Sequence, residues 1–201
     1  MSGIGLIILA AGASTRMGTP KQLLKYKQHS LLRHMVEQAI ASVCKPIIVV
    51  LGAYAERIRP EIESFNAHIV ENLDWSDGMS RSIQVGIEAL NIVNPNVEAA
   101  VLMLCDQPFV STQIINQLVE VYQTTNQKIV ASEYTGIWGV PALFNCHLFP
   151  KLTMLSGAAG ARQVIKEHIQ KVVSIPFPEG AIDLDTLEDY EQFQRMKSNI
   201  I

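Results

Sequence analysis

Three short, uninterrupted apolar runs restrict the fold of this chain more than any other feature of its sequence. They span 3–10, 46–51 and 97–104, and turn or polar residues bound each of them. Apolar runs this continuous and rich in β-branched residues are typical of strands buried on both faces, as in a mostly parallel sheet. Weaker candidate strands lie at 67–70, 128–131 and 171–175.

Helical periodicity fills the intervals between these runs. Apolar residues recur at helical spacing over 31–40 and again over 114–122, where Ser111 and Thr112 occupy the N-cap region. Alternating strands and helices predict right-handed βαβ crossovers and a three-layer α/β/α Rossmann-like fold with a mostly parallel sheet. The chain has no internal repeat or linker-like tract, so we expect one domain over 1–201. Ligands of such folds bind at the carboxyl ends of the strands.

Composition excludes several classes of function. With 201 residues, 48% of them hydrophobic and 17% charged, the chain can bury a sizeable core. A net charge of -3 provides no basic footprint for nucleic acid. The longest apolar run, 4–11, is too short to span a bilayer, and no positively charged segment precedes it. We therefore expect a cytoplasmic protein that acts on small molecules, without a nucleic-acid or membrane partner.

The loop after the first run is suited to binding an anion. Its small residues and its two glycines, Gly12 and Gly18, let backbone N–H groups approach a ligand closely, while Arg16 and Lys21 add positive charge. The two glycines enclose five residues and are followed by Thr19-Pro20, which excludes a P-loop, and no G-x-G-x-x-G fingerprint is present. A nucleoside triphosphate fits these features.

A second motif spans 77–86 and leads into an apolar-periodic helix. It presents Ser80, Arg81 and Ser82 at the helix start, where free N–H groups and hydroxyls can recognise a polar base or a ribose. Such residues at a helix start are also ordinary capping residues.

Three aspartates are candidate metal ligands. Asp106 ends the third apolar run, where a desolvated carboxylate requires a partner or a metal ion. Asp183 and Asp185 alternate along an extended segment, so they point to one side. Mg²⁺ usually takes one or two carboxylates, which favours Asp106 with Asp185 and leaves Asp183 as a second choice. Thr186 and Asp189 are spaced as a capping box for a following helix.

These motifs together resemble the MobA-like nucleotidyltransferases. The first loop matches the family pattern LAAGxSxRMGxxK, and Gly78 to Gly86 matches GMxxSIxxG. The segment 181–189 resembles DIDTPEDL, and 139–144 resembles a G-x-P-x-x-F core. The chain departs from the family's G-D-x-G-A-R pattern at 157–162, where Ala158 stands in place of the aspartate. That departure affects the acceptor side of the resemblance.

The resemblance implies roles for individual residues. Catalysis is expected from Arg16, Lys21 and Asp106, and Mg²⁺ binding from Asp106, Asp185 and Asp183. Residues expected to bind the nucleotide are Leu9, Ala10, Ala11, Gly12, Arg16, Lys21, Gly78, Met79, Ser80 and Ser82. Residues expected to bind the acceptor are Gly139, Pro141 and Arg162.

The implied reaction is transfer of CMP from CTP to a molybdopterin-type cofactor, with a molybdoenzyme as recipient of the product. Family members that use GTP tend to read LAGG where this chain has Leu9-Ala-Ala-Gly12, so the methyl group of Ala11 favours the smaller cytosine. Two alternatives remain open: an enzyme that uses GTP or another phosphorylated acceptor, and a non-catalytic molybdenum cofactor chaperone.

Overall fold

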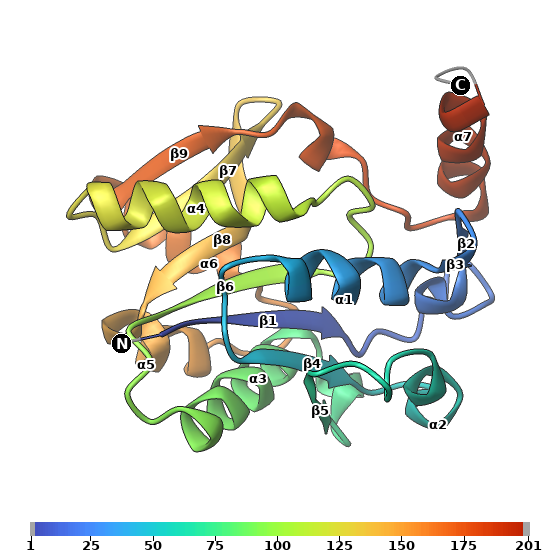
Figure 1. Cartoon of the computed structure of the whole chain (residues 1–201), viewed down its shortest axis with the longest axis horizontal. Coiled ribbons are helices and arrows are strands. Elements are labelled where there is room, and N and C mark those ends of the chain that lie inside the picture. The colour runs from blue at the N-terminus through green and yellow to red at the C-terminus, as the bar shows by residue number, and fades with distance from the viewer. Residues whose placement is uncertain (1–2, 199–201) are drawn as a thin grey trace.

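A seven-stranded sheet is the centre of the computed structural model, which describes residues 3–198 (Figure 1). Its strand order is β5-β4-β1-β6-β8-β7-β9. The strands are β1 (Ile4–Ala10), β4 (Ile47–Leu51), β5 (His68–Glu71), β6 (Ala99–Leu104), β7 (Ile129–Tyr134), β8 (Ile137–Asn145) and β9 (Val172–Pro176). The short strands β2 (Lys25–Tyr26) and β3 (His29–Ser30) form a separate antiparallel pair. The three strong apolar runs form the adjacent strands β4, β1 and β6, and the three weaker candidates form β5, β7 and β9.

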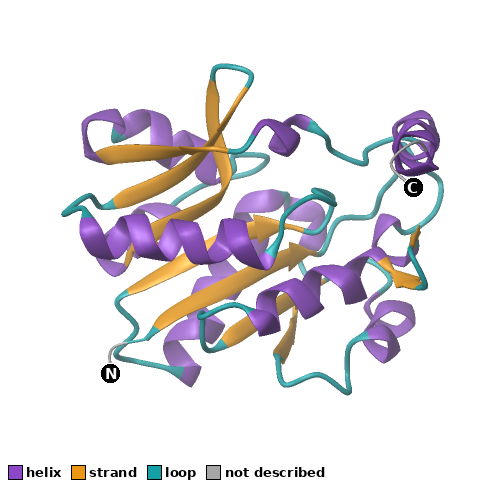
Figure 2. Cartoon of the chain, turned by 45° about the horizontal axis from the view of Figure 1, so that its top comes forward, coloured by secondary structure: helices purple, strands orange, loops and turns teal. Residues whose placement is uncertain are grey.

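Helices cover both faces of the sheet (Figure 2). They are α1 (Leu31–Ala41), α2 (Ala55–Ile58), α3 (Met79–Val93), α4 (Thr112–Thr124), α5 (Phe149–Thr153), α6 (Ala161–Glu167) and α7 (Leu187–Ser198). One buried apolar cluster joins α1 and α4 to one face of the sheet, and a second joins α3, α5 and α6 to the other. Along β1, Leu6 and Ile8 belong to the first cluster and Ile7 and Leu9 to the second, because successive side chains of a strand alternate.

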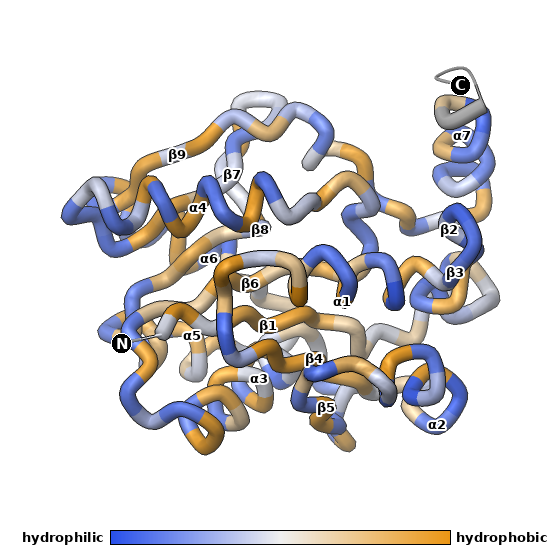
Figure 3. Tube along the Cα trace, viewed as in Figure 1, coloured by the Kyte–Doolittle hydropathy of each residue, from blue (hydrophilic) through white to orange (hydrophobic). Residues whose placement is uncertain are grey.

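Most strand pairs are parallel, as the sequence predicted. Strand β1 runs parallel to β4 and β6, and β7 runs parallel to β9. Strand β8 is the antiparallel insertion between β6 and β7. Figure 3 shows how strongly hydrophobic residues concentrate along the central strands β4, β1 and β6. Within residues 3–198, no helix combines the length and apolar character needed to cross a membrane.

The sequence did not predict β8, because Gly139 and Pro141 interrupt its pattern. The register of β7 with β8 shifts between Ala131 and Ser132: Ala131 pairs with Ala142, whereas Ser132 pairs with Gly139. Pro141 therefore lies in an irregular stretch outside the regular ladder. A proline is tolerated there because it has no N–H group to contribute.

Local capping signals agree with the observed helices. The Ser111 side chain accepts a hydrogen bond from the Ile114 N–H at the start of α4. At the start of α7, the Asp189 carboxylate accepts from the Thr186 N–H at 2.8 Å, and the Thr186 hydroxyl accepts from the Asp189 N–H at 3.2 Å. This reciprocal capping box confirms the sequence expectation and fixes the direction in which the chain leaves Asp185.

Close packing of α3 against the sheet depends on Gly86. A Cβ atom at this position would lie 2.7 Å from Ile7 Cγ2 and 3.1 Å from Val50 Cγ2, both on buried β-branched side chains. We expect Gly86→Val to lower the free energy of unfolding by roughly 2 kcal/mol through overpacking, as measured by urea denaturation. The control is Glu88→Val on the exposed side of the same helix, which should change stability by no more than about 0.5 kcal/mol.

Candidate active site

The loop that follows β1 is held in shape by its own hydrogen bonds. The buried Gln22 side chain donates from Nε2 to the carbonyl oxygens of Ala10 and Gly12, at 2.8 and 2.9 Å. The Ser14 hydroxyl accepts from the Lys21 N–H at 3.0 Å. Ser14 and Gly18 adopt left-handed backbone conformations, with φ of 53° and 71°. These contacts give Lys21 a fixed position beside the carboxyl end of β1.

Lys21 links three segments that are far apart in the sequence. Its Nζ lies 2.5 Å from Asp106 Oδ2 at the end of β6, and 3.1 Å from Asp185 Oδ1 in the segment before α7. Arg16 reaches the other oxygen of Asp185, with an Nη2 to Oδ2 distance of 3.1 Å. The Leu184 N–H also donates to the Asp106 carbonyl oxygen at 3.0 Å. The structure thus joins by ion pairs four of the five residues predicted to neutralise phosphate charge or to bind metal, and Asp183 is the fifth.

Burial strengthens the electrostatic coupling at this point. The side chains of Lys21 and Asp106 are only 17% and 14% exposed, whereas that of Arg16 is 72% exposed. Although burial alone would lower the pKa of Lys21, the charges of Asp106 and Asp185 raise it above its ordinary value. Lys21 is therefore a permanent cation at the centre of the site.

Asp183 lies near the same carboxylates but remains outside these ion pairs. Partial burial, followed by the charges of Asp106 and Asp185, raises the pKa of the Asp183 carboxyl to about 6. The carboxyl groups of Asp106, Asp183 and Asp185 lie at one end of the sheet, and an additional positive charge there would reduce their mutual repulsion.

The carboxylate oxygens of Asp106 and Asp185 fit a divalent cation that takes few ligands from the protein. Among the described residues, the buried side-chain oxygens without a hydrogen-bond partner are Gln22 Oε1, Asp106 Oδ1 and Gln107 Oε1. All three are acceptors at this edge of the sheet, and Asp106 Oδ1 lacks a donor or a cation. The described residues contain no cluster of three or more acidic, histidine or cysteine side chains arranged as a metal site. Two carboxylates are the usual protein share for Mg²⁺.

A cavity of about 270 Å³ lies beside Lys21 and Asp106. It is bounded by the first loop, by the turn at Trp75 and by the start of α3; we call it the loop cavity. The residues predicted to bind nucleotide that line it are Leu9, Ala10, Ala11, Gly12, Lys21, Gly78, Met79 and Ser82. Arg16 and Ser80 do not line it, although Arg16 is linked through Asp185 to Lys21, which does.

Ser80 instead connects two loops. Both its N–H and its hydroxyl donate to the Gly157 carbonyl oxygen, at 3.3 and 2.9 Å. Gly78 makes this approach possible, because a Cβ atom there would overlap the Gly157 carbonyl group. The loop around Ala158 therefore keeps a defined place beside the start of α3. Arg81 does not line the cavity, and its guanidinium lies 3.2 Å from the Asp74 carboxylate.

A second cavity of about 160 Å³ adjoins the first, since Leu9, Met79 and Leu104 line both. We call it the strand cavity. Gly139 and Arg162, predicted to contact the acceptor, line it. Pro141 does not, because it is buried within β8, where its carbonyl oxygen accepts a hydrogen bond from Ser132.

Sequence reasoning missed several residues of this region. Tyr134 lines the strand cavity, and burial followed by the charge of Asp183 raises the pKa of its phenol. The buried Gln22 side chain, directly after the loop motif, ties that loop to β1. Asn72 donates to the Ser82 hydroxyl at 3.0 Å. Their spacing in the sequence carries no signal, because each acts through a partner elsewhere in the chain.

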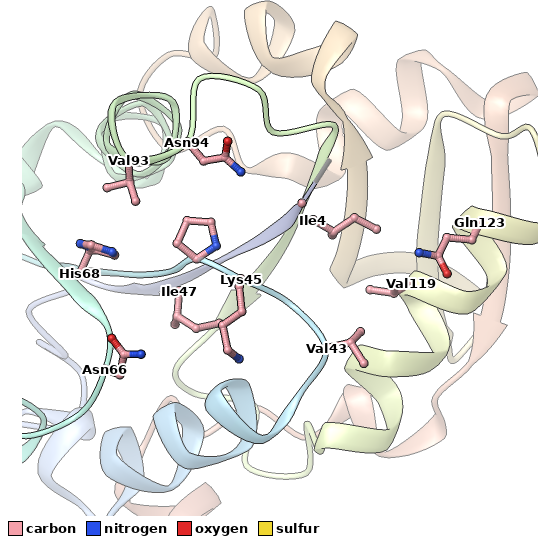
Figure 4. A pocket seen from close by; sticks show the side chains of 12 residues that line it. Ile4, Val43, Lys45, Ile47, Asn66, His68, Val93, Asn94, Val119 and Gln123 are labelled. Atoms are coloured by element: carbon pink, nitrogen blue, oxygen red, sulfur yellow. The ribbon is translucent and has the colours of Figure 1, made fainter. Parts of the chain in front are cut away.

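A larger cavity, about 760 Å³, lies at the opposite end of the sheet (Figure 4). It is an open depression around Ile4, Ile47 and His68 at the amino ends of β1, β4 and β5. None of the described residues that line it is acidic, and the Lys45 ammonium donates to three nearby backbone carbonyl groups. This depression therefore lacks the paired charges of the site at the carboxyl edge.

Known proteins are similar to most of this chain in sequence or in fold. The family model described as a MobA-like NTP transferase domain matches residues 6–172, so Asp183 and Asp185 lie beyond the match. Nicotine blue oxidoreductase of Paenarthrobacter nicotinovorans is 30% identical over 195 residues, covering 90% of this chain and 92% of that protein. Molybdenum cofactor cytidylyltransferase of Escherichia coli K12 is 26% identical over 191 residues, covering 94% and 95%. The manganese complex of Rv0371c from Mycobacterium tuberculosis H37Rv has a TM-score of 0.78 at 28% identity, covering 94% of this chain and 97% of that one.

The raised pKa of Asp183 predicts a pH-dependent penalty on stability. Its folded-state pKa of about 6 exceeds the ordinary aspartate value of about 3.9, so the folded state binds more protons between these values and loses stability as the pH rises through them. Asp183→Asn removes this loss. The difference in urea midpoint between variant and wild type, measured in EDTA, should grow in favour of the variant from about pH 4 to pH 6. Asp77→Asn is the control for losing an exposed carboxylate, and a difference that stays constant with pH would contradict the prediction.

Proposed function

The chain belongs to the MobA-like NTP transferase family, and on that premise we propose that it transfers CMP from CTP to a molybdopterin-type cofactor and releases pyrophosphate. The observation that carries this proposal is the position of Lys21 between Asp106 and Asp185, next to the loop cavity. Cation and carboxylates at one edge of a cavity are what a metal-bound triphosphate requires.

In the proposed reaction, an oxygen of the acceptor phosphate forms a bond with the α-phosphorus of CTP. The bond from that phosphorus to the oxygen bridging the β-phosphorus breaks, and pyrophosphate leaves with the bonding electrons. The acceptor phosphate is already ionised near neutral pH, so its attack requires no strong general base. Catalysis then depends on positioning and on neutralising charge.

The residues of this chain divide these tasks. Lys21 and Arg16 neutralise phosphate charge as pyrophosphate leaves, and the backbone of Ala10 to Gly12 lines the nucleotide. Asp106 and Asp185 would hold Mg²⁺, with Asp183 as the second choice. The bound ion supplies charge neutralisation on the phosphates and orients them for in-line displacement. Gly139 and Arg162 face the acceptor, and the strand cavity that they line supports this assignment.

The preference for cytosine rests on Ala11. Its side chain is 4% exposed and belongs to the apolar cluster beside α3, while the residue also lines the loop cavity. A methyl group there limits the space for a larger purine. The acceptor is less tightly defined, because Ala158 replaces the family's aspartate in the loop held by Ser80.

Pyrophosphate release by the purified protein tests the proposal. We expect release from CTP with a molybdopterin acceptor in the presence of Mg²⁺, loss of release in EDTA, and recovery on adding Mg²⁺ or Mn²⁺. A thermal-shift panel of CTP, GTP, ATP and UTP should favour CTP, since a ligand at 100 times its Kd stabilises by about 2.7 kcal/mol. Preference for GTP would contradict the role of Ala11, and no release from any NTP would contradict the transferase.

A substitution at Asp106 tests catalysis separately from nucleotide binding. In Asp106→Asn the carboxylate charge next to Lys21 is lost while the side chain keeps its size, so we expect pyrophosphate release to fall at least about 100-fold. CTP binding, measured by thermal shift, should persist through the loop contacts. Glu120→Gln, on the exposed side of α4, is the control and should match the wild type. Equal turnover by Asp106→Asn and wild type would remove Asp106 from the mechanism.

A further inference from the structure

We propose that the indole of Trp75 is the stacking surface for the nucleobase in the loop cavity, an inference that rests on the proposed use of an NTP. Trp75 is 39% exposed and lines that cavity together with Ala11 and Lys21. It is the aromatic residue among those that line it. A base whose triphosphate lies at Lys21 has this indole as its available aromatic partner.

Several hydrogen bonds hold the backbone of the turn that carries Trp75. The Asn72 N–H donates to the Leu51 carbonyl oxygen at the end of β4, and the Asn72 side chain bonds both the Ser82 hydroxyl and the Asp74 N–H. The Asp77 N–H donates to the Asp74 carbonyl, and the Gly78 N–H to the Trp75 carbonyl. A ligand that packs on this indole therefore does not have to order the backbone of the turn.

Gly52 brings the indole close to the first loop. A Cβ atom on Gly52 would lie 2.7 Å from Trp75 Cβ and 2.8 Å from Ala11 Cβ, so both side chains pack against the bare backbone of this glycine. The Ala53 N–H donates to the Ala11 carbonyl at 3.0 Å and ties the strand end to the loop. Ala11 and Trp75 thus form one continuous wall of the loop cavity.

The other tryptophan of the chain, Trp138, has a packing role instead of a place at the cavity. Trp138 lies on β8, is paired with Glu133 across the sheet, and packs against the apolar cluster that includes α3, α5 and α6. Its ring contributes to packing, and it lines neither the loop cavity nor the strand cavity. Trp75 instead presents apolar surface at a cavity edge, where a flat ligand can cover it. Stacking of this kind accepts any base, because each base has a π-face.

The two tryptophans make a matched experiment. Trp138→Phe leaves Trp75 as the only tryptophan, and the binding of CTP should change the fluorescence of Trp75. Trp75→Phe leaves Trp138 as the only tryptophan, and the binding of CTP should not change the fluorescence of Trp138. Equilibrium dialysis then compares CTP with inorganic tripolyphosphate, which has no base. In Trp75→Ala the Kd for CTP should rise roughly 5- to 150-fold, as for loss of one base–aromatic stack, while the Kd for tripolyphosphate stays unchanged.

The readouts distinguish stacking from a structural role. A Trp75→Ala variant that loses affinity for both ligands equally would contradict stacking, because a distorted loop weakens phosphate contacts as well. An unchanged Kd for CTP would also contradict it. Binding is measured without an acceptor, so failure of pyrophosphate release in the wild type would contradict the proposed function alone.

Discussion

The ammonium group of Lys21 is the interaction on which the carboxyl edge of this sheet depends. Asp106 follows two residues after a strand that is buried on both sides, and Asp185 reaches the same place from a segment that comes after β9. Without a cation between them, two carboxylates at this spacing would repel each other in a partly desolvated place. Lys21 satisfies both, and it can do so because Gln22 and Ser14 fix the loop that carries it.

A bound ligand could replace the partners in these same ion pairs. The ammonium of Lys21, which pairs with two carboxylates, is also a favourable partner for a polyphosphate. The carboxylates of Asp106 and Asp185 are suitable ligands for a divalent ion. Burial strengthens these electrostatic interactions. The side chains of Lys21 and Asp106 are 17% and 14% exposed, so water screens their charges less than it screens charges at the surface. Arg16, at the outer side of Asp185, extends the positive charge toward solvent.

Continuous apolar runs predicted the fold because a strand buried on both faces leaves an unmistakable pattern in the sequence. Strand β8 left no such pattern, since Gly139 and Pro141 lie where its register with β7 shifts. In the site, Lys21 and Asp106 were predicted from motif position and strand ends. The contact of Ser80 with Gly157 was not, because these residues are 77 positions apart and only the packed structure brings them together.

The hydrogen bonds from Ser80 to Gly157 couple two segments that are far apart in the sequence. The helix start that borders the loop cavity and the loop that precedes Arg162 share one carbonyl oxygen, and the contact requires a residue without a side chain at Gly78. Moving the loop that precedes Arg162 from one member of the family to another, without the start of α3, would therefore break this contact. A chimera that keeps this geometry must inherit the helix start and the loop as one inseparable module.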